Sequence, residues 1–298
     1  MFAEAASQLA TVRDWLRFAV SRFNEAQLFF GHGNADAYDE AAYLILHTLH
    51  LPLDRLEPFL EARLTSGEIA SLSSLLSRRI EQRVPAAYLT REAWLGDYRF
   101  YVDERVIVPR SPIAHMLLDE TLAPWIEDFD SIRRVLDLCT GSGCLAILAA
   151  HVFSEAQVDA TELSPQAIEV ARRNIDDHGV ADRVSVRKGD LFGDLKTRYD
   201  LIVANPPYVN LDSMQALPAE YRAEPALALA GGADGLDIVR RILREAPAHL
   251  KPEGCLVVEV GHNRHVLETA FPDIPFIWLE TAPQAGHVFL LQASDLPR

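Results

Sequence analysis

The stretch Asn205-Pro206-Pro207-Tyr208 has the residue types and spacing best suited to a chemical step in this sequence. Two successive prolines hold φ at about −65° and remove two backbone donors, so Asn205 and the Pro206 carbonyl keep little freedom to move. The result is a rigid set of acceptors beside an aromatic ring. Such a set would accept both hydrogens of a planar –NH2 group, as in glutamine or adenine, while Tyr208 stacks on its face. Acceptors placed there favour the pyramidal geometry in which the nitrogen attacks an electrophile.

The element that must position this motif is the apolar run directly before it, residues 199–204. We interpret this run as a short buried strand, which places Asn205 at a strand end. For the motif alone, a stiff turn without a chemical role remains an alternative, since Asn and Pro are common turn residues. The residues at the neighbouring strand ends therefore decide whether the motif has a chemical role or is only a stiff turn.

A glycine-containing turn follows an earlier apolar strand and leads into an apolar helix from Cys144. The turn comprises Asp137, Leu138, Cys139, Thr140, Gly141, Ser142 and Gly143. Glycines let a ligand approach the backbone, and free N–H groups at a helix start favour a carboxylate or phosphate. We interpret the turn as part of a site for a nucleotide-bearing ligand. A dinucleotide fingerprint would need a third glycine where Ala146 stands, so NAD is the weaker interpretation, and a plain tight turn remains an alternative.

Two further strand ends carry carboxylates. Glu162 ends the second strand of this region, where it can accept hydrogen bonds from both ribose hydroxyls of an adenosine. Asp190 follows the third strand, where it can accept from an adenine amino group while Leu191 packs on the ring. The alternatives are a solvated acid near a helix N-terminus for Glu162 and an ordinary turn residue for Asp190. Together, four consecutive strand ends place ligand-ready groups on one edge of a sheet, where open α/β sheets bind ligands.

The second part of the chain alternates strand and helix patterns, which predicts an α/β fold with a Rossmann-like sheet of seven strands, mostly parallel. Helices are expected after the first three strands and around the fifth. The last two strands, joined by a short turn at Pro283 to His287, should be antiparallel. The strands are expected at residues 135–138, 158–161, 184–187, 201–204, 255–260, 276–280 and 288–291. The long irregular stretch from Val209 to Asp234 is a candidate lid over the site.

The N-terminal part differs in pattern. Apolar residues at helical spacing from Val12, and a capping box that begins at Thr65, predict a helical domain over residues 1–84 for substrate recognition. Residues 85–110, rich in aromatic and β-branched types, predict a β-hairpin linker. Ser111-Pro112 then starts a helix expected to reach about Trp125, and residues 111–298 form the predicted catalytic domain.

Composition narrows the function classes. The net charge of −15 weighs against stable nucleic-acid binding, in which phosphate contacts dominate affinity, and fits a basic protein or a small cationic cofactor. The sequence has no run of about 20 apolar residues and no basic start of a signal peptide, so we expect a cytoplasmic protein without membrane contact. Three scattered cysteines predict buried thiols, with neither a disulfide framework nor a metal site.

The motifs together resemble those of class I S-adenosylmethionine-dependent methyltransferases that act on glutamine amides. Within this class the chain is similar to the group that methylates a glutamine of large-subunit ribosomal protein uL3. The resemblance covers residues 85–290 and includes Val108-Pro109-Arg110-Ser111-Pro112 and the segments around Glu224-Pro225 and Gly231-Gly232. The sister group, which modifies peptide-chain release factors, usually has Pro-Arg-Pro-Asp/Glu-Thr-Glu where this chain has Pro109-Arg110-Ser111-Pro112-Ile113-Ala114, which favours the uL3 group.

The resemblance implies in-line transfer of a methyl group from S-adenosyl-L-methionine to the target amide, without a metal. Asn205 and the Pro206 carbonyl would hold the –NH2 group and Tyr208 would flank it. The glycine turn, Glu162, Asp190 with Leu191, and Asn205 would bind the cofactor. Three rivals remain open: a release-factor methyltransferase, an adenine methyltransferase, which should show a basic face, and a non-catalytic S-adenosylmethionine-binding module.

Overall fold

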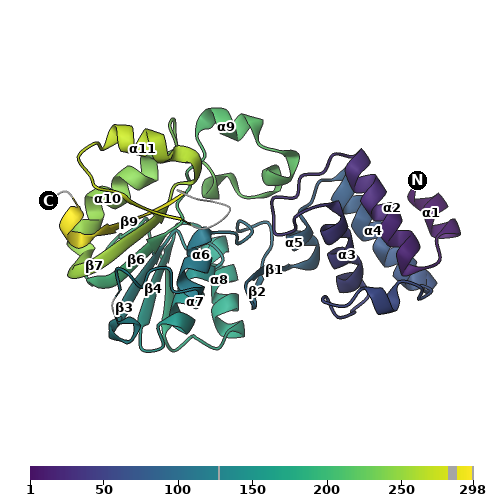
Figure 1. The fold of residues 1–298 in the computed structure, drawn as a ribbon, viewed down its shortest axis with the longest axis horizontal. Helices are drawn as coiled ribbons and strands as arrows, with labels where there is room; N and C mark the ends of the chain where they lie inside the picture. The colour runs from purple at the N-terminus through teal and green to yellow at the C-terminus, as the bar shows by residue number, and fades with distance from the viewer. Residues whose placement is uncertain (127, 281–286, 297–298) are drawn as a thin grey trace. The chain divides into compact units, whose positions relative to one another are not determined.

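The computed structural model describes residues 1–126, 128–280 and 287–296 and divides the chain into two compact units (Figure 1). The helical unit comprises Met1–Ala93 together with Pro218–Ala223. The sheet unit comprises Trp94–Leu217 and Glu224–Arg298. No pattern in the sequence indicates that residues 218–223 belong to the helical unit. The domain limits expected at residues 84 and 110 stay predictions.

The helical unit is built from five helices whose starts follow local sequence signals. Thr11 and Thr65 each form a capping box, in which the threonine side chain accepts from the third helical N–H and an acidic residue there accepts from the threonine N–H. The helices are α1 (Phe2–Gln8), α2 (Val12–Glu25), α3 (Ala37–Thr48), α4 (Ser66–Glu81) and α5 (Ala86–Thr90). Trp15, Phe23 and Leu72 are fully buried where these helices pack together, as the helical spacing predicts.

A buried ionic network holds residues 218–223 in the helical unit. The guanidinium of Arg79 donates to Glu40 (2.6 Å) and Glu220 (3.3 Å), and all three side chains are almost completely buried. Glu220 also accepts from Arg83 (3.1 Å) and from the backbone N–H of Phe29 (3.1 Å). Burial alone would raise the pKa of Glu220, but these hydrogen bonds outweigh it and lower the pKa. Removing one member would leave a buried charge without its partner.

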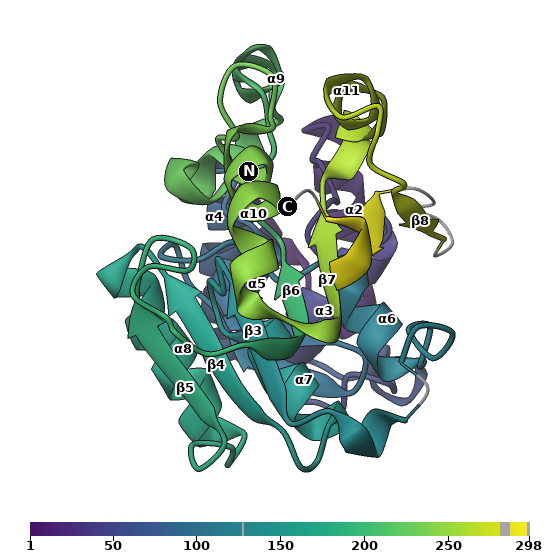
Figure 2. The same cartoon turned by 90° about the vertical axis from the view of Figure 1, so that its left-hand side faces the viewer.

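The main sheet of this unit has, within the described residues, seven strands in the order β5-β4-β3-β6-β7-β9-β8, which confirms the predicted Rossmann-like sheet. Figure 2 shows the twisted sheet running from β5 on the left to β8 on the right. The strands are β3 (Arg134–Leu138), β4 (Gln157–Glu162), β5 (Val184–Lys188), β6 (Tyr199–Ala204), β7 (Leu250–Glu259), β8 (Ile277–Leu279) and β9 (Val288–Gln292). All neighbours among β3 to β7 are parallel, and β9 is antiparallel to both β7 and β8. The turn expected between the last two strands lies outside the described residues except for its final residue, His287.

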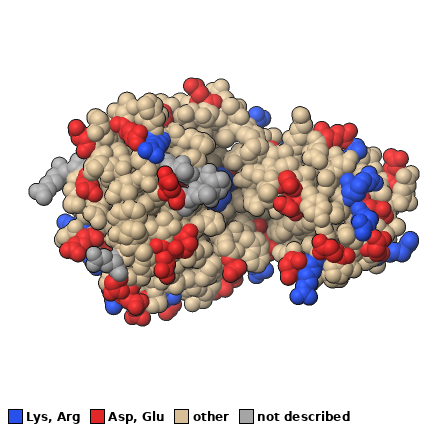
Figure 3. Space-filling model, viewed as in Figure 1, with Lys and Arg blue, Asp and Glu red and all other residues tan. Residues whose placement is uncertain are grey.

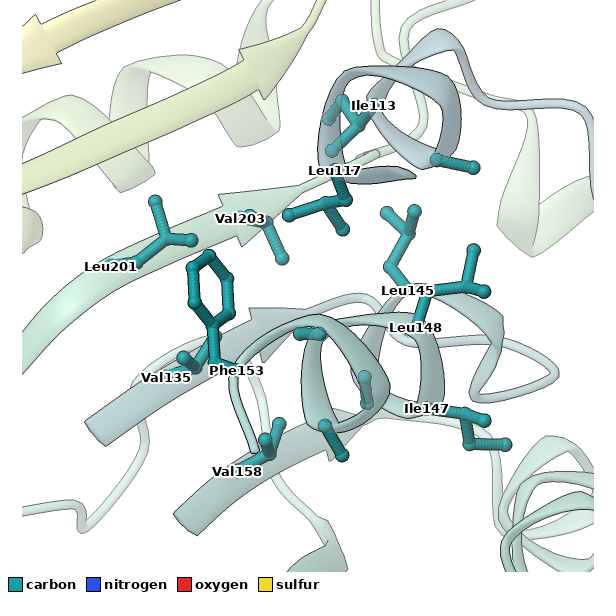
Figure 4. Packing of buried hydrophobic residues seen from close by; sticks show 14 of the residues in the cluster. Ile113, Leu117, Val135, Leu145, Ile147, Leu148, Phe153, Val158, Leu201 and Val203 are labelled. Carbon is teal, nitrogen blue, oxygen red and sulfur yellow. The ribbon is translucent and has the colours of Figure 1, made fainter. Parts of the chain in front are cut away.

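Each face of the sheet is covered by its own apolar core because strand side chains alternate between the two faces. On one face, Val135 and Val203 pack with helices α6 (Pro112–Leu118) and α7 (Cys144–Val152) (Figure 4). On the other face, Leu136 and Ile202 pack with residues of α10 (Asp237–His249) and α11 (Arg264–Ala270). Helix α8 (Pro165–Asp177) follows β4. The paired cores hold the carboxyl ends of the parallel strands at one common edge.

The hairpin region differs from the prediction. Only β1 (Glu92–Leu95) and β2 (Tyr98–Tyr101) form the hairpin, and residues 86–90, expected as part of it, form α5. Val106 and Val108 are buried but lie outside any strand, because no partner strand meets them. The predicted helix from Pro112 ends at Leu118 and not near Trp125, since Glu120 adopts a left-handed φ of 57°.

Two predicted connections are also corrected. No helix follows β5, because the short connection from Gly189 to β6 forms turns, with Leu191 and Gly193 at positive φ. The segment 209–234 was expected to be irregular, but it contains α9 (Leu211–Ala216), η3 (Ala219–Ala223) and η4 (Ala226–Ala228). None of the helices in the described part of the chain combines the length and apolar composition that a membrane span requires.

Candidate active site

A cavity of about 390 Å³ lies at the carboxyl ends of the parallel strands and is large enough for a nucleotide-sized ligand. Predicted site residues from four strand ends line it together. They are Cys139 and Gly141 after β3, Glu162 at the end of β4, Asp190 and Leu191 after β5, and Asn205 after β6. The structure therefore brings together the groups that the sequence placed on one sheet edge, while their individual roles stay predictions.

Other predicted residues lie outside the lining. Asp137 and Thr140 are buried, Pro206 is buried, and Tyr208 is half-buried; none of these lines the cavity, nor does Gly143. Sequence reasoning missed two further parts of the wall. These are residues 104–107, before the first helix of the sheet unit, and an apolar group formed by Pro225, Leu227, Ala228, Ala230 and Ile238. The first group lies in a segment interpreted as a hairpin. The second comes from the segment interpreted as a lid and from the start of α10, and its apolar residues carry no chemical group that marks a site.

Asp137 joins the glycine-containing turn to the first turn of α7. Its Oδ2 accepts from the Thr140 hydroxyl and from the backbone N–H of Ala146 (3.1 Å), which lies in the first turn of the helix. Gly143 stands at the N-cap with φ of 82° and has no side chain to cap the helix, so Asp137 supplies the missing acceptor. Burial raises the pKa of Asp137 to about 7, against the effect of its two hydrogen bonds.

Two non-glycine residues in the cavity wall adopt left-handed backbone conformations. Cys139, directly after β3, has φ of 58°, and Leu191, three residues after the end of β5, has φ of 52°. Such conformations cost about 1 kcal/mol or more per residue and persist only where the surrounding structure imposes them. Their position on two adjacent walls of one cavity indicates that the turns are shaped for a ligand.

Glu162 is held at both oxygens and still has acceptor capacity. Its Oε2 accepts from the N–H of Gly141 (2.9 Å), and its Oε1 accepts from the N–H of Ser164 (2.9 Å). A carboxylate offers about four lone-pair sites, so two remain for hydroxyl donors of a ligand. The two backbone bonds fix the carboxylate between the glycine turn and the start of α8.

Asp190 has a partner that the sequence did not indicate. Arg241, on α10, donates to its Oδ1 at 3.0 Å. The hydrogen bond from Arg241 to Asp190 raises the pKa of this arginine above its ordinary value. Asp190 lines the cavity and its carboxylate keeps acceptor capacity for a ligand, while the ion pair limits the rotamers that Asp190 can adopt.

The loop after Asn205 is tied at both ends. The N–H of Val209 donates to Leu229 O (2.9 Å), and the N–H of Gly231 donates back to Val209 O (2.8 Å). Farther along, the guanidinium of Arg110 binds both oxygens of Glu224, whose side chain is fully buried. The segment 209–234 is therefore anchored within the sheet unit at its base and at Glu224.

The residues at this site fit S-adenosyl-L-methionine. Glu162 has free lone pairs for ribose hydroxyls, Asp190 has an oxygen for an amino group, and Leu191 and Ile238 supply apolar wall. Among the described residues no group donates a hydrogen bond to Oδ1 of Asp137, although this atom is buried. A buried carboxylate oxygen without a donor is suited to a cationic ammonium group such as the cofactor carries.

Comparison with known proteins defines the class first. A family model described as "Methyltransferase small domain" matches residues 114–219. The fold resembles the crystal structure of the hMettl16 catalytic domain in complex with MAT2A 3′UTR hairpin 1, with a TM-score of 0.51, 16% identity, and coverage of 82% of this chain and 86% of that chain. The matched domain is that of a methyltransferase, and the sheet has the fold of this solved methyltransferase structure.

Relatives then define the family. The chain is 56% identical to the ribosomal protein uL3 glutamine methyltransferase of Neisseria gonorrhoeae (strain ATCC 700825 / FA 1090), over 99% of both chains. It is 57% identical to the protein of the same name from Bordetella pertussis (strain Tohama I / ATCC BAA-589 / NCTC 13251), over 97% of both chains. The chain belongs to the ribosomal protein uL3 glutamine methyltransferase family. The methyl donor of this enzyme family is S-adenosyl-L-methionine.

Proposed function

We propose that this chain transfers a methyl group from S-adenosyl-L-methionine to the side-chain amide nitrogen of a glutamine in ribosomal protein uL3. The observation that carries the proposal is the position of Asn205, which lines the same cavity as Glu162 and Asp190. A fixed amide acceptor thus lies at the wall of the cavity that fits the cofactor. The names of the full-length relatives support uL3 as the substrate.

The residues of the chain act by holding the acceptor nitrogen. When bound, S-adenosyl-L-methionine supplies an electrophilic methyl group on a positively charged sulfur. The amide oxygen of Asn205 and the carbonyl of Pro206 accept hydrogen bonds from the target –NH2 group and keep its lone pair directed into the cavity. Tyr208 flanks the group. Orientation of two bound reactants supplies much of the acceleration, so the amide needs no strong base in advance.

Charge supports a basic protein as the partner. The net charge is −15, and residues 111–298 contain 16 basic and 28 acidic residues. On the face shown in Figure 3, acidic side chains are scattered over both units. A ribosomal protein is a suitable partner for such a surface. We infer that the enzyme acts in the cytoplasm, and its negative net charge weighs against stable binding to nucleic acid.

The direct test is methyl transfer to purified substrates. The purified chain is incubated with labelled S-adenosyl-L-methionine and with uL3, a peptide-chain release factor, or single-stranded DNA and RNA in separate reactions. We expect label on uL3 alone, and peptide mass spectrometry should place one methyl group on a glutamine. Label on the release factor alone would reassign the chain to the sister group, and label on adenine would reassign it to the nucleic-acid methyltransferases. Cofactor binding without transfer to any substrate would support a non-catalytic binding module.

A further inference from the structure

The ring and backbone of Tyr208 are fixed by the last residue of β7 and by residues of the turn after it. Its hydroxyl donates to Oε1 of Glu259 at 2.8 Å. Its carbonyl accepts from Nδ2 of Asn263 at 2.7 Å. Its ring lies against Gly261, where an added Cβ would stand 2.6 Å from Cε2 of the ring. Tyr208 is therefore held at three points by the end of β7 and the turn after it.

Glu259 is itself held in a buried position. Its residue exposure is only 5%, and its second oxygen, Oε2, accepts from the hydroxyl of Ser111 at 2.6 Å. Ser111 caps α6, since its side chain also accepts from the N–H of Ile113. Burial raises the pKa of Glu259, and the hydrogen bonds from Ser111 and Tyr208 oppose the shift. The charged form of this carboxylate thus depends on its two hydroxyl donors.

We propose that Glu259 is a positioning residue for methyl transfer: its buried carboxylate, anchored by Ser111, holds the ring of Tyr208 in place after Asn205. The inference rests on the proposed function. Glu259 does not line the cavity, so it acts through Tyr208 and makes no contact of its own with the reactants. The site thereby extends from four strand ends to a fifth, that of β7.

The geometry explains why a carboxylate is used here. A carboxylate has no proton to donate, so both hydroxyls must donate to it, and this fixes the rotation of the phenol and the position of the ring. A glutamine in the same place can donate as well as accept, so it permits a second arrangement. Hydrogen bonds to charged groups are also stronger than neutral ones, which favours a single position of Tyr208.

A double-mutant cycle tests the assignment. Glu259→Gln should lower single-turnover methylation of uL3 roughly tenfold, the loss expected for one hydrogen bond to a charged group. The affinity for S-adenosyl-L-methionine should stay within about twofold. In the Tyr208→Phe background, which lacks the hydroxyl, Glu259→Gln should change the rate by less than about twofold. Equal losses in both backgrounds, or no loss in either, would overturn the proposal.

A matched control is available on the same sheet. Tyr199, at the start of β6, donates to the buried Asp159 at 3.0 Å. Tyr199→Phe removes a comparable hydroxyl–carboxylate bond away from the cavity, so it should reduce stability without changing the rate of transfer. Ser111→Ala removes the hydrogen bond from Ser111 to Glu259 and keeps the one from Tyr208 to Glu259. We expect a smaller loss of transfer rate than in Glu259→Gln. A loss of rate in Tyr199→Phe equal to that in Glu259→Gln would indicate a general loss of packing and contradict the positioning role.

A spectroscopic measurement separates this inference from the proposed function. With carbon-13-labelled tyrosine, Tyr208→Phe identifies the ring resonance of Tyr208 among those of the eight tyrosines. Glu259→Gln should shift that resonance and leave the resonance of Tyr199 unchanged. An unshifted resonance would overturn the contact regardless of activity. If the resonance shifts and the wild-type chain fails to methylate uL3, the proposed function fails and the Glu259–Tyr208 contact stands.

Discussion

Arg110 and Glu224 form a two-point ion pair, with Nη1–Oε1 at 2.5 Å and Nη2–Oε2 at 2.7 Å, across a sequence separation of 114 residues. The Glu224 side chain is fully buried, and it also accepts from the backbone N–H of Val108 at 2.9 Å. The pair fixes residue 224 in the sheet unit, next to the cavity-lining residue Pro225. Two points of the candidate lid, Val209 and Glu224, are therefore anchored within the sheet unit, whereas residues 218–223 belong to the helical unit.

Arg110→Ala should destabilise the protein by about 3 kcal/mol, because it removes the two-point ion pair from a fully buried carboxylate. Arg110→Lys keeps the charge but loses the two-point geometry, so its cost should be smaller. Urea unfolding measures both values. The control is Arg240→Ala, which removes a similar pair with Asp234 whose side chains are 39% and 37% exposed. That variant should cost at most about 1 kcal/mol, and equal costs for the two pairs would contradict the role of burial.

Glu162→Ala should weaken S-adenosyl-L-methionine binding by at least about tenfold, since two charge-assisted hydrogen bonds to the ribose are lost. Asp190→Ala should weaken it less, because the Asp190 side chain is 55% exposed and water competes for its hydrogen bonds. Calorimetry on both variants gives the comparison. An unchanged affinity for S-adenosyl-L-methionine in Glu162→Ala would contradict the prediction that Glu162 binds the ribose hydroxyls.

Asp137 should make stability depend on pH. Its ordinary value of 3.8 applies to the unfolded chain, and burial raises the folded pKa to about 7. Between these values the folded state keeps a proton that the unfolded state has lost, so this group lowers the free energy of unfolding as pH rises, with no further change above about 7. Asp137→Asn removes this titration. The stability of wild type relative to Asp137→Asn should therefore fall from pH 4 to pH 7, and a difference that is constant across this range would contradict the assignment.

Glu220→Ala should affect recognition of the protein substrate more than cofactor binding. Glu220 holds residues 218–223 in the helical unit, where Tyr221 lies beside His32, with ring centroids 4.5 Å apart. Loss of the carboxylate should release this segment and raise the KM for uL3, while the Kd for S-adenosyl-L-methionine stays within about twofold. Arg13→Ala, which removes an exposed ion pair with Glu61 in the same unit, serves as the control. Loss of cofactor affinity in Glu220→Ala would contradict this division of roles.

Local patterns predicted the sheet and much of the cavity. Alternating strand and helix signals placed all seven strands, and motifs at strand ends identified Glu162, Asp190 and Asn205, which the structure brings to one cavity. These predictions succeeded because the carboxyl ends of parallel strands meet at one edge whatever the order of the strands. Local signals were less reliable for element ends, as the early end of α6 at Leu118 shows.

The contacts that position the site could not be predicted in the same way. Tyr208 and Glu259 are 51 residues apart, and their contact depends on β6 and β7 being neighbours in the sheet. Glu220 and Arg79 are 141 residues apart, and no pattern in residues 218–223 indicates a helical partner. Such pairs arise from tertiary packing, to which a single sequence gives no direct signal.

The position of Asn205 on the cavity wall makes its amide the group on which the account depends. Asn205→Ala removes one fixed acceptor without adding charge, so cofactor affinity should fall only modestly while transfer slows by about 100- to 1000-fold. Asn205→Asp keeps an acceptor but adds an anion that stabilises the positively charged ground state more than the charge-dispersed transition state. We expect it to bind S-adenosyl-L-methionine at least as well as wild type and still to transfer slowly.

The most direct test is single-turnover methylation of purified uL3 by Asn205→Ala, with cofactor and enzyme both saturating. We expect a rate reduced by about 100-fold or more at nearly unchanged cofactor affinity. A rate close to that of wild type would contradict the claim that Asn205 holds the amide that receives the methyl group.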